Sequence, residues 1–159
     1  MRDDLPAWRS LLFVPVTAEK FVRTCADRGA DGIILDLEDS VAPSQKDHAR
    51  TLIADAIPQV SRNGADVLVR VNRPWRLLVR DLEAAVIPGV AALMLTKVDS
   101  PEHVHACAEI VAELEAERDK LIARIAELED EVTALSGLTE EVEGRLDGAI
   151  GEIHAALAR

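Results

Sequence analysis

Charged residues follow three of the short apolar runs in this sequence. Asp36, Glu38 and Asp39 come at the end of the second run, and Arg70 and Lys97 end the third and fourth. Three carboxylates facing an arginine and a lysine could bind a divalent cation and an anionic substrate, because arginine suits carboxylates through paired hydrogen bonds. Charged residues also end buried strands simply because solvent begins there. These residue types alone therefore leave both interpretations open.

The apolar runs predict the strands that would position these groups. Each run is almost continuously hydrophobic, which is typical of parallel strands covered on both faces. In a parallel α/β fold, reactive groups collect where the carboxyl ends of the strands meet the following loops. The predicted strands are residues 11–15, 32–37, 67–71 and 90–96.

Helical patterns separate the runs. Residues 44–62 carry one apolar stripe, with Ser44 and Asp47 as a predicted capping box, and Ser100-Pro101 predicts another helix start. Further helices are expected from Thr17 through Arg28 and, shorter, around residues 81–86. The predicted fold class is α/β, with about four parallel βα units joined by right-handed crossovers.

Four motifs in order over about residues 9–116 resemble the citrate lyase beta-subunit-like, or HpcH/HpaI aldolase, family. The resemblance lies in the stretches Arg9-Ser10-Leu11-Leu12-Phe13-Val14-Pro15, Ala30-Asp31-Gly32-Ile33-Ile34-Leu35-Asp36-Leu37-Glu38-Asp39-Ser40-Val41-Ala42-Pro43, Val69-Arg70-Val71-Asn72 and Leu95-Thr96-Lys97-Val98. It implies a TIM-type barrel of which residues 1–112 form half. A complete barrel of this kind has about 250 residues.

The resemblance also implies an activity. Members cleave or form a carbon–carbon bond next to a carbonyl, on acyl-CoA or 2-oxo acid substrates, with Mg²⁺ stabilising the enolate. Arg70 matches the arginine that binds the substrate carboxylate, and Glu38 and Asp39 match an acidic catalytic pair. Those two carboxylates and Asp36 are expected near the metal through water. The other residues expected to contact substrate are Asn72, Lys97, Arg9 and Lys20.

The sequence departs from the family pattern at several places. Val16 stands where a glycine normally follows the first strand, and Thr96 replaces a proline before Lys97. The Glu and Asp motifs that supply the direct metal ligands in the family do not occur after residue 97. The expected enzyme is therefore incomplete, and weak or inactive alone.

Residues 113–159 differ in composition from the rest. They hold 5 basic and 13 acidic residues, whereas residues 1–112 hold 13 and 16. Leu114, Arg118, Leu121, Ile125, Leu128, Val132 and Leu135 alternate by four and three, which is a heptad pattern with Arg118 as its one polar member. Ser136-Gly137 is expected to interrupt it. This segment is predicted to form either an acidic helical hairpin or a coiled coil.

Composition limits the partners. A net charge of −11 disfavours nucleic acid and anionic membranes, and only four aromatic side chains are present for stacking on bases. Cys25 and Cys107 have no CxxC partner, and no apolar stretch is long enough to cross a membrane, so a cytoplasmic protein is expected.

Two functions are consistent with these features. The first is a Mg²⁺-dependent lyase that binds a small carboxylate or an acyl-CoA. The second is a non-catalytic structural or oligomerisation protein, truncated, fused or redesigned. Self-association is expected in either case, through an open sheet edge or through the helical tail.

Overall fold

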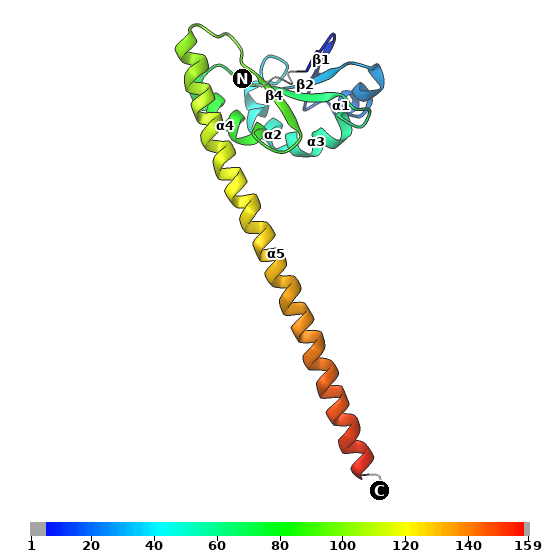
Figure 1. The fold of residues 1–159 in the computed structure, drawn as a ribbon. Helices are drawn as coiled ribbons and strands as arrows, with labels where there is room; N and C mark the ends of the chain where they lie inside the picture. Colours follow the sequence, from blue (N-terminus) through cyan, green and yellow to red (C-terminus); the bar gives the residue numbers. More distant parts are fainter. Residues whose placement is uncertain (1–5, 158–159) are drawn as a thin grey trace. The chain divides into compact units, whose positions relative to one another are not determined.

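The computed structural model describes residues 6–157. The chain divides into two compact units, Met1–Glu115 and Ala116–Arg159. The first holds a sheet and its helices, and the second is helical throughout its described part (Figure 1).

The first unit is built on a four-stranded parallel sheet in which the strands lie side by side in chain order. Each apolar run forms a strand within two residues of its predicted bounds. The strands are β1 (Leu11–Pro15), β2 (Gly32–Asp36), β3 (Asp66–Arg70) and β4 (Val90–Met94). The prediction of four parallel βα units is therefore confirmed.

The helices between the strands differ from their predicted bounds. The single helix expected over residues 44–62 consists of two helices that meet at Leu52, preceded by a short 3-10 turn. Ser44 lies inside that turn and no side chain caps the helix start, so the predicted capping box is wrong. The elements are α1 (Glu19–Thr24), η1 (Cys25–Arg28), η2 (Pro43–Gln45), α2 (Lys46–Thr51), α3 (Ile53–Val60), α4 (Trp75–Ala85) and α5 (Pro101–Leu157).

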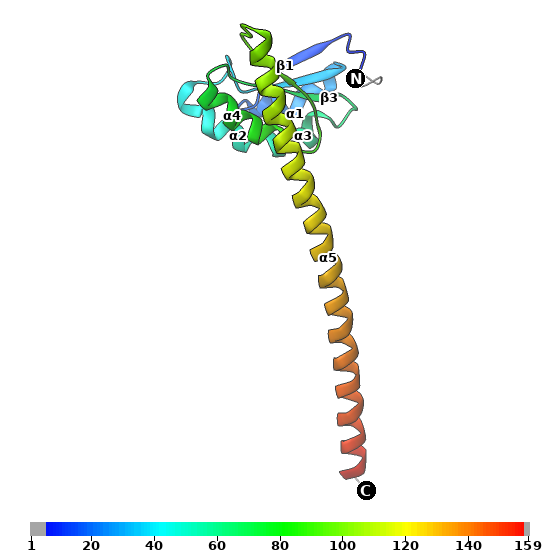
Figure 2. The same cartoon turned by 60° about the vertical axis from the view of Figure 1, so that its left-hand side comes forward.

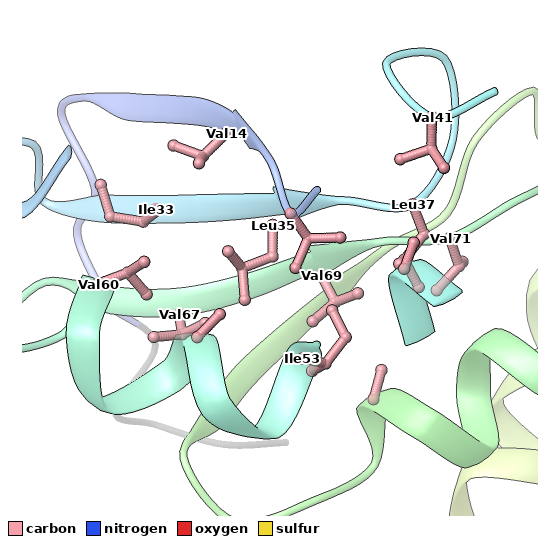
Figure 3. Close-up of a cluster of buried hydrophobic side chains, with 14 of the residues drawn as sticks. Val14, Ile33, Leu35, Leu37, Val41, Ile53, Val60, Val67, Val69 and Val71 are labelled. Carbon is pink, nitrogen blue, oxygen red and sulfur yellow. The ribbon is translucent and has the colours of Figure 1, made fainter. Parts of the chain in front are cut away.

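The hydrophobic core lies between one face of the sheet and the helices α1 to α4, which Figures 1 and 2 both place on the same side. Val67 and Val69 of β3 point toward Ile53 and Val60 of α3 (Figure 3). These four side chains are at most 1% exposed. Cys107 in the first turns of α5 joins the same core. One face of the sheet is thereby packed against the helices, most fully at β2 and β3.

The opposite face of the sheet is partly open. Phe13 of β1 is 47% exposed, although Ile34 in the same row of the sheet is fully buried. Among the described residues, β1 and β4 each pair with one strand, so the sheet has two free edges.

The C-terminal segment is one helix, not a hairpin. Helix α5 continues from Pro101 to Leu157 through Ser136-Gly137 without a turn. A glycine in a helix costs only about 1 kcal/mol relative to alanine, and strong helix formers follow at once, so helical hydrogen bonding continues. Ser100 caps the helix as expected, since its hydroxyl accepts a hydrogen bond from the His103 N–H at 3.3 Å. In the described part of the chain, no helix has a stretch apolar enough to span a membrane.

Candidate functional site

The candidate site lies at the carboxyl edge of the sheet. The strand register places Asp36 directly beside Arg70, with Pro15 and Met94 completing the same row. Residues in one row of a sheet project to one face. Because Leu35 and Val69 face the helices, Asp36 and Arg70 project from the opposite, open face.

Asp36 is the most enclosed member of the site. Its carboxylate accepts hydrogen bonds from Arg70 Nε at 2.7 Å and Nη2 at 2.6 Å, and its side chain is 1% exposed. The Ser40 hydroxyl and the backbone N–H groups of Ser40 and Glu38 also donate to it. Burial by itself raises the pKa of Asp36, but the hydrogen bonds from Arg70 and the loop outweigh it and lower the pKa from 3.8 to about 2. Asp36 is therefore a fixed anion that holds the loop after β2.

Arg70 has one nitrogen left for other contacts. Nε and Nη2 are both used by Asp36, and the hydrogen bond to that carboxylate raises the pKa of the arginine. Nη1 lies 3.5 Å from a Glu38 carboxylate oxygen and 3.8 Å from one of Asp39. The guanidinium also stacks over the Phe13 ring, 4.7 Å from its centre. The paired hydrogen bonds expected toward a substrate are thus made to Asp36, and Nη1 is the nitrogen that faces the site.

Lys97 closes the site from the end of β4. Its Nζ lies 2.6 Å from Glu38 Oε1 and 3.5 Å from Asp39 Oδ1, and these contacts raise the pKa of the lysine, the Glu38 contact most. The backbone of Lys97 has φ 49°, in the left-handed region that non-glycine residues seldom occupy. Such a conformation is typical of residues fixed at a functional site.

Buried polar groups hold the surrounding loops. Lys46 Nζ donates to the carbonyl oxygens of Leu37 at 2.6 Å and Glu38 at 2.5 Å. The Asn72 side-chain amide donates to Leu37 O at 2.8 Å and to Asp81 Oδ2 at 2.7 Å. Asn72, predicted to bind substrate, therefore uses its amide nitrogen within the fold.

A hollow opens beside these groups. Its volume is about 400 Å³, and it is lined by Glu38, Asp39, Val41, Pro43, Lys46, Asn72, Arg73, Pro74 and Lys97. Lys46 and Arg73 were not among the predicted site residues, and a solvated surface was the expected place of Arg73. Arg73 follows Asn72 directly, so its place after a strand end was the available signal.

The structure does not bring every predicted residue to this place. Arg9 precedes β1 and lies at the amino edge of the sheet, where its Nη2 is 2.7 Å from Asp31 Oδ1. The helix that contains Lys20 begins just after the carboxyl end of β1, and Lys20 is exposed there. Asp36, Glu38, Asp39, Arg70 and Lys97 do lie together.

The acidic residues do not form a complete metal site. Both oxygens of Asp36 are occupied by hydrogen-bond donors, and Glu38 is paired with Lys97. Within residues 6–157, no group of three or more His, Cys, Asp or Glu side chains is placed to hold a metal ion. Mg²⁺ prefers near-octahedral oxygen coordination. Glu38 and Asp39 are the only two carboxylates of this cluster left to supply oxygens, and Glu38 already contacts Lys97.

The fold and the site define an α/β protein with charged groups clustered at the carboxyl ends of parallel strands. Comparison with known proteins gives a closer assignment. Residues 9–145 match the family HpcH/HpaI aldolase/citrate lyase. The chain belongs to this family, as the motifs at the strand ends predicted.

Individual relatives match over about two thirds of the chain. It is 31% identical over 110 residues to citrate lyase subunit beta of Leuconostoc mesenteroides subsp. cremoris, a match that covers 69% of this chain and 36% of that protein. It is 34% identical over 110 residues to (3S)-malyl-CoA thioesterase of Cereibacter sphaeroides, covering 67% of this chain and 38% of that protein. The chain thus spans little more than a third of the length of these relatives.

A solved structure supports the same family assignment. The protein CitE from Mycobacterium tuberculosis, in complex with magnesium, acetoacetate and coenzyme A, superimposes with a TM-score of 0.51 at 33% identity. The match covers 65% of this chain and 38% of that one.

Proposed function

We propose that this chain supplies the substrate-binding side of a carbon–carbon lyase site, with residues 1–112 forming the first four βα units of a TIM-type barrel. Family membership supports the reaction class, since one relative is a citrate lyase subunit, and the malyl-CoA thioesterase supports an acyl-CoA substrate. The consecutive parallel order of the strands supports the barrel. The same relatives weigh against a purely structural role.

The observation that carries the proposal is that Arg70 Nη1 and Lys97 Nζ both approach Glu38 at the carboxyl edge of the sheet, beside a hollow lined by Glu38 and Lys97. The carboxylate of a 2-oxo acid or of an acyl-CoA substrate would contact both cations. Glu38 lies between them, 3.5 Å from Arg70 and 2.6 Å from Lys97. A substrate carboxylate would compete with Glu38 for contact with Arg70 and Lys97. Once displaced from these two cations, Glu38 would be available for proton transfer. Catalysis of this kind depends on placing cations where negative charge develops.

Magnesium is the cofactor that the family implies, and a relative was solved with it. The described residues do not fit the ion by themselves, because Glu38 and Asp39 alone remain as carboxylate ligands. We therefore expect this chain alone to bind substrate weakly, and carbon–carbon cleavage by it to be slow or absent.

Binding of oxaloacetate and of malyl-CoA, each of which carries a free carboxylate, is measured by isothermal titration calorimetry to test the proposal. Lys97→Ala is the informative variant because Lys97 is two-thirds exposed and its buried partner Glu38 keeps Arg70 Nη1 at 3.5 Å. A charge-assisted hydrogen bond contributes about 1.5–3 kcal/mol, so the variant should bind roughly 10- to 100-fold more weakly.

Arg9→Ala is the matched control, since it removes a cation at the opposite edge of the sheet. Its affinity should equal that of the unchanged protein. The proposal is wrong if the unchanged protein binds neither ligand at millimolar concentration, or if both variants lose affinity equally.

A further inference from the structure

The part of α5 in the second unit carries a continuous row of large apolar side chains. Leu121, Ile125, Leu128, Val132 and Leu135 are between 43% and 63% exposed. Large apolar patches of this kind mark interaction surfaces in proteins. We therefore expect another helix to cover this row, and the spacing of residues along α5 indicates what that helix is.

Because α5 does not break at Ser136-Gly137, the heptad pattern has one register along its length. The alternation of four and three continues from Leu135 to Thr139 and then to Val142. We call the resulting row the seam: Arg118, Leu121, Ile125, Leu128, Val132, Leu135, Thr139, Val142, Leu146, Ala149, Ile153 and Ala156. Sustained spacing of this kind is the signature of a coiled coil.

The glycines of the helix support this register independently. Gly137, Gly144 and Gly151 are seven residues apart, and together with Gly148 they all lie outside the seam. A Cβ placed on any of the four would meet no atom within 4 Å. The four glycines thus lie on the outer side of the helix, and every position of the seam has a side chain that can pack.

We propose that residues 118–156 pair with the same helix of a second copy of this chain as an antiparallel two-stranded coiled coil. Antiparallel pairing centred near Gly137 places Leu121 against the partner's Ile153, and Ile125 against the partner's Ala149. Leu128 then faces the partner's Leu146 and Val132 the partner's Val142, and Arg118 lies at the end of the seam opposite the partner's Ala156.

The residues that flank the seam favour this orientation. Antiparallel pairing brings Ile122 beside the partner's Ile150 and Leu138 beside the partner's Leu138, so exposed apolar side chains cover one another. It also brings Glu131 beside the partner's Arg145. Flanking charges of this kind set orientation in coiled coils. One contact opposes it, because Glu129 approaches the partner's Glu143.

Parallel pairing is poorer at the same positions. It stacks Arg118 on the partner's Arg118 and Ala149 on the partner's Ala149. It also sets Ile122 beside the partner's Glu117 and Leu138 beside the partner's Glu143. Its one matched pair of charges is Arg124 with the partner's Glu129.

Disulfide trapping in the full chain distinguishes the two orientations. A mixture of Leu121→Cys and Ile153→Cys chains, mildly oxidised, should give a covalent heterodimer on a non-reducing gel, and neither variant alone should crosslink. The unchanged protein is the control, since Cys25 and Cys107 are both buried. Self-crosslinking of Leu121→Cys alone would overturn the antiparallel orientation.

Mass by light scattering tests pairing itself. The unchanged protein should have twice the chain mass of 17.3 kDa. Ile125→Asp places a charge in the seam and should weaken dimerisation roughly tenfold or more. Ala126→Asp adds the same charge one residue away, on the outer side, and should leave it unchanged. A monomer at high micromolar concentration, or equal effects of both variants, would overturn the proposal.

Discussion

Replacing Asp36 by asparagine should destabilise the first unit strongly. Asparagine keeps the shape of the side chain but turns an N–H donor toward groups that themselves donate, namely Arg70 and the N–H and hydroxyl of Ser40. Breaking a buried ion pair by removing one partner costs about 3–5 kcal/mol. At a denaturant slope of about 2 kcal/mol per molar urea, the unfolding midpoint should fall by roughly 2 M.

The effect should also depend on pH. The pKa of Asp36 is lowered from 3.8 to about 2, so its contribution to stability is complete above the unfolded value and is lost as the pH falls toward the folded value. The difference in unfolding free energy between the unchanged protein and Asp36→Asn should shrink by roughly 1 kcal/mol between pH 6 and pH 3.

Urea unfolding followed by circular dichroism at several pH values measures both quantities. The control is Asp27→Asn, which removes one member of the exposed pair between Asp27 and Arg62. Water screens that pair, so its loss should change stability much less. A midpoint for Asp36→Asn equal to that of the control, or a difference that grows toward low pH, would refute the reasoning.

Three further changes test other parts of the fold. Gly89→Ala should lower the melting temperature in calorimetry by roughly 5 °C or more, because Gly89 has φ 93° and a new Cβ would lie 2.7 Å from Ile57 Cγ2; an unchanged value would contradict this. Asp81→Asn should cost about 3–5 kcal/mol in urea unfolding, since Asp81 is fully buried and pairs with Arg50 at 2.7 Å; a loss below that range would count against it. Lys46→Met removes two hydrogen bonds to loop carbonyls, so hydrogen exchange should quicken in the segment between β2 and α2, and not in β3.

The sequence was informative wherever one local rule determined the structure. Continuous apolar runs gave the four strands, because a strand buried on both faces tolerates few polar residues. The meeting of Asp36, Arg70 and Lys97 followed from their places at strand ends in a parallel sheet. The end of the helix expected through Arg28 also agrees, since Gly29 follows η1 with φ 70°, the left-handed conformation in which glycine commonly ends a helix.

Features that depend on distant contacts were missed. The hydrogen bond from the Asn72 side chain to Asp81 forms because α4 packs beside the end of β3. No local sequence pattern predicts that packing. The break at Leu52 lies within one continuous apolar stripe, so periodicity could not reveal it. The prediction of a hairpin at Ser136-Gly137 rested only on the low helix propensity of these residues, which is a weak guide inside a long helix.

The chain-order arrangement of β1 to β4 has a consequence for synthesis on the ribosome. Each strand pairs with the one translated just before it, so every βα unit can dock as soon as it emerges. Short loops between contacting segments favour rapid folding. Growth of the sheet would therefore proceed from the N-terminus, with the β4 side as the last edge to form.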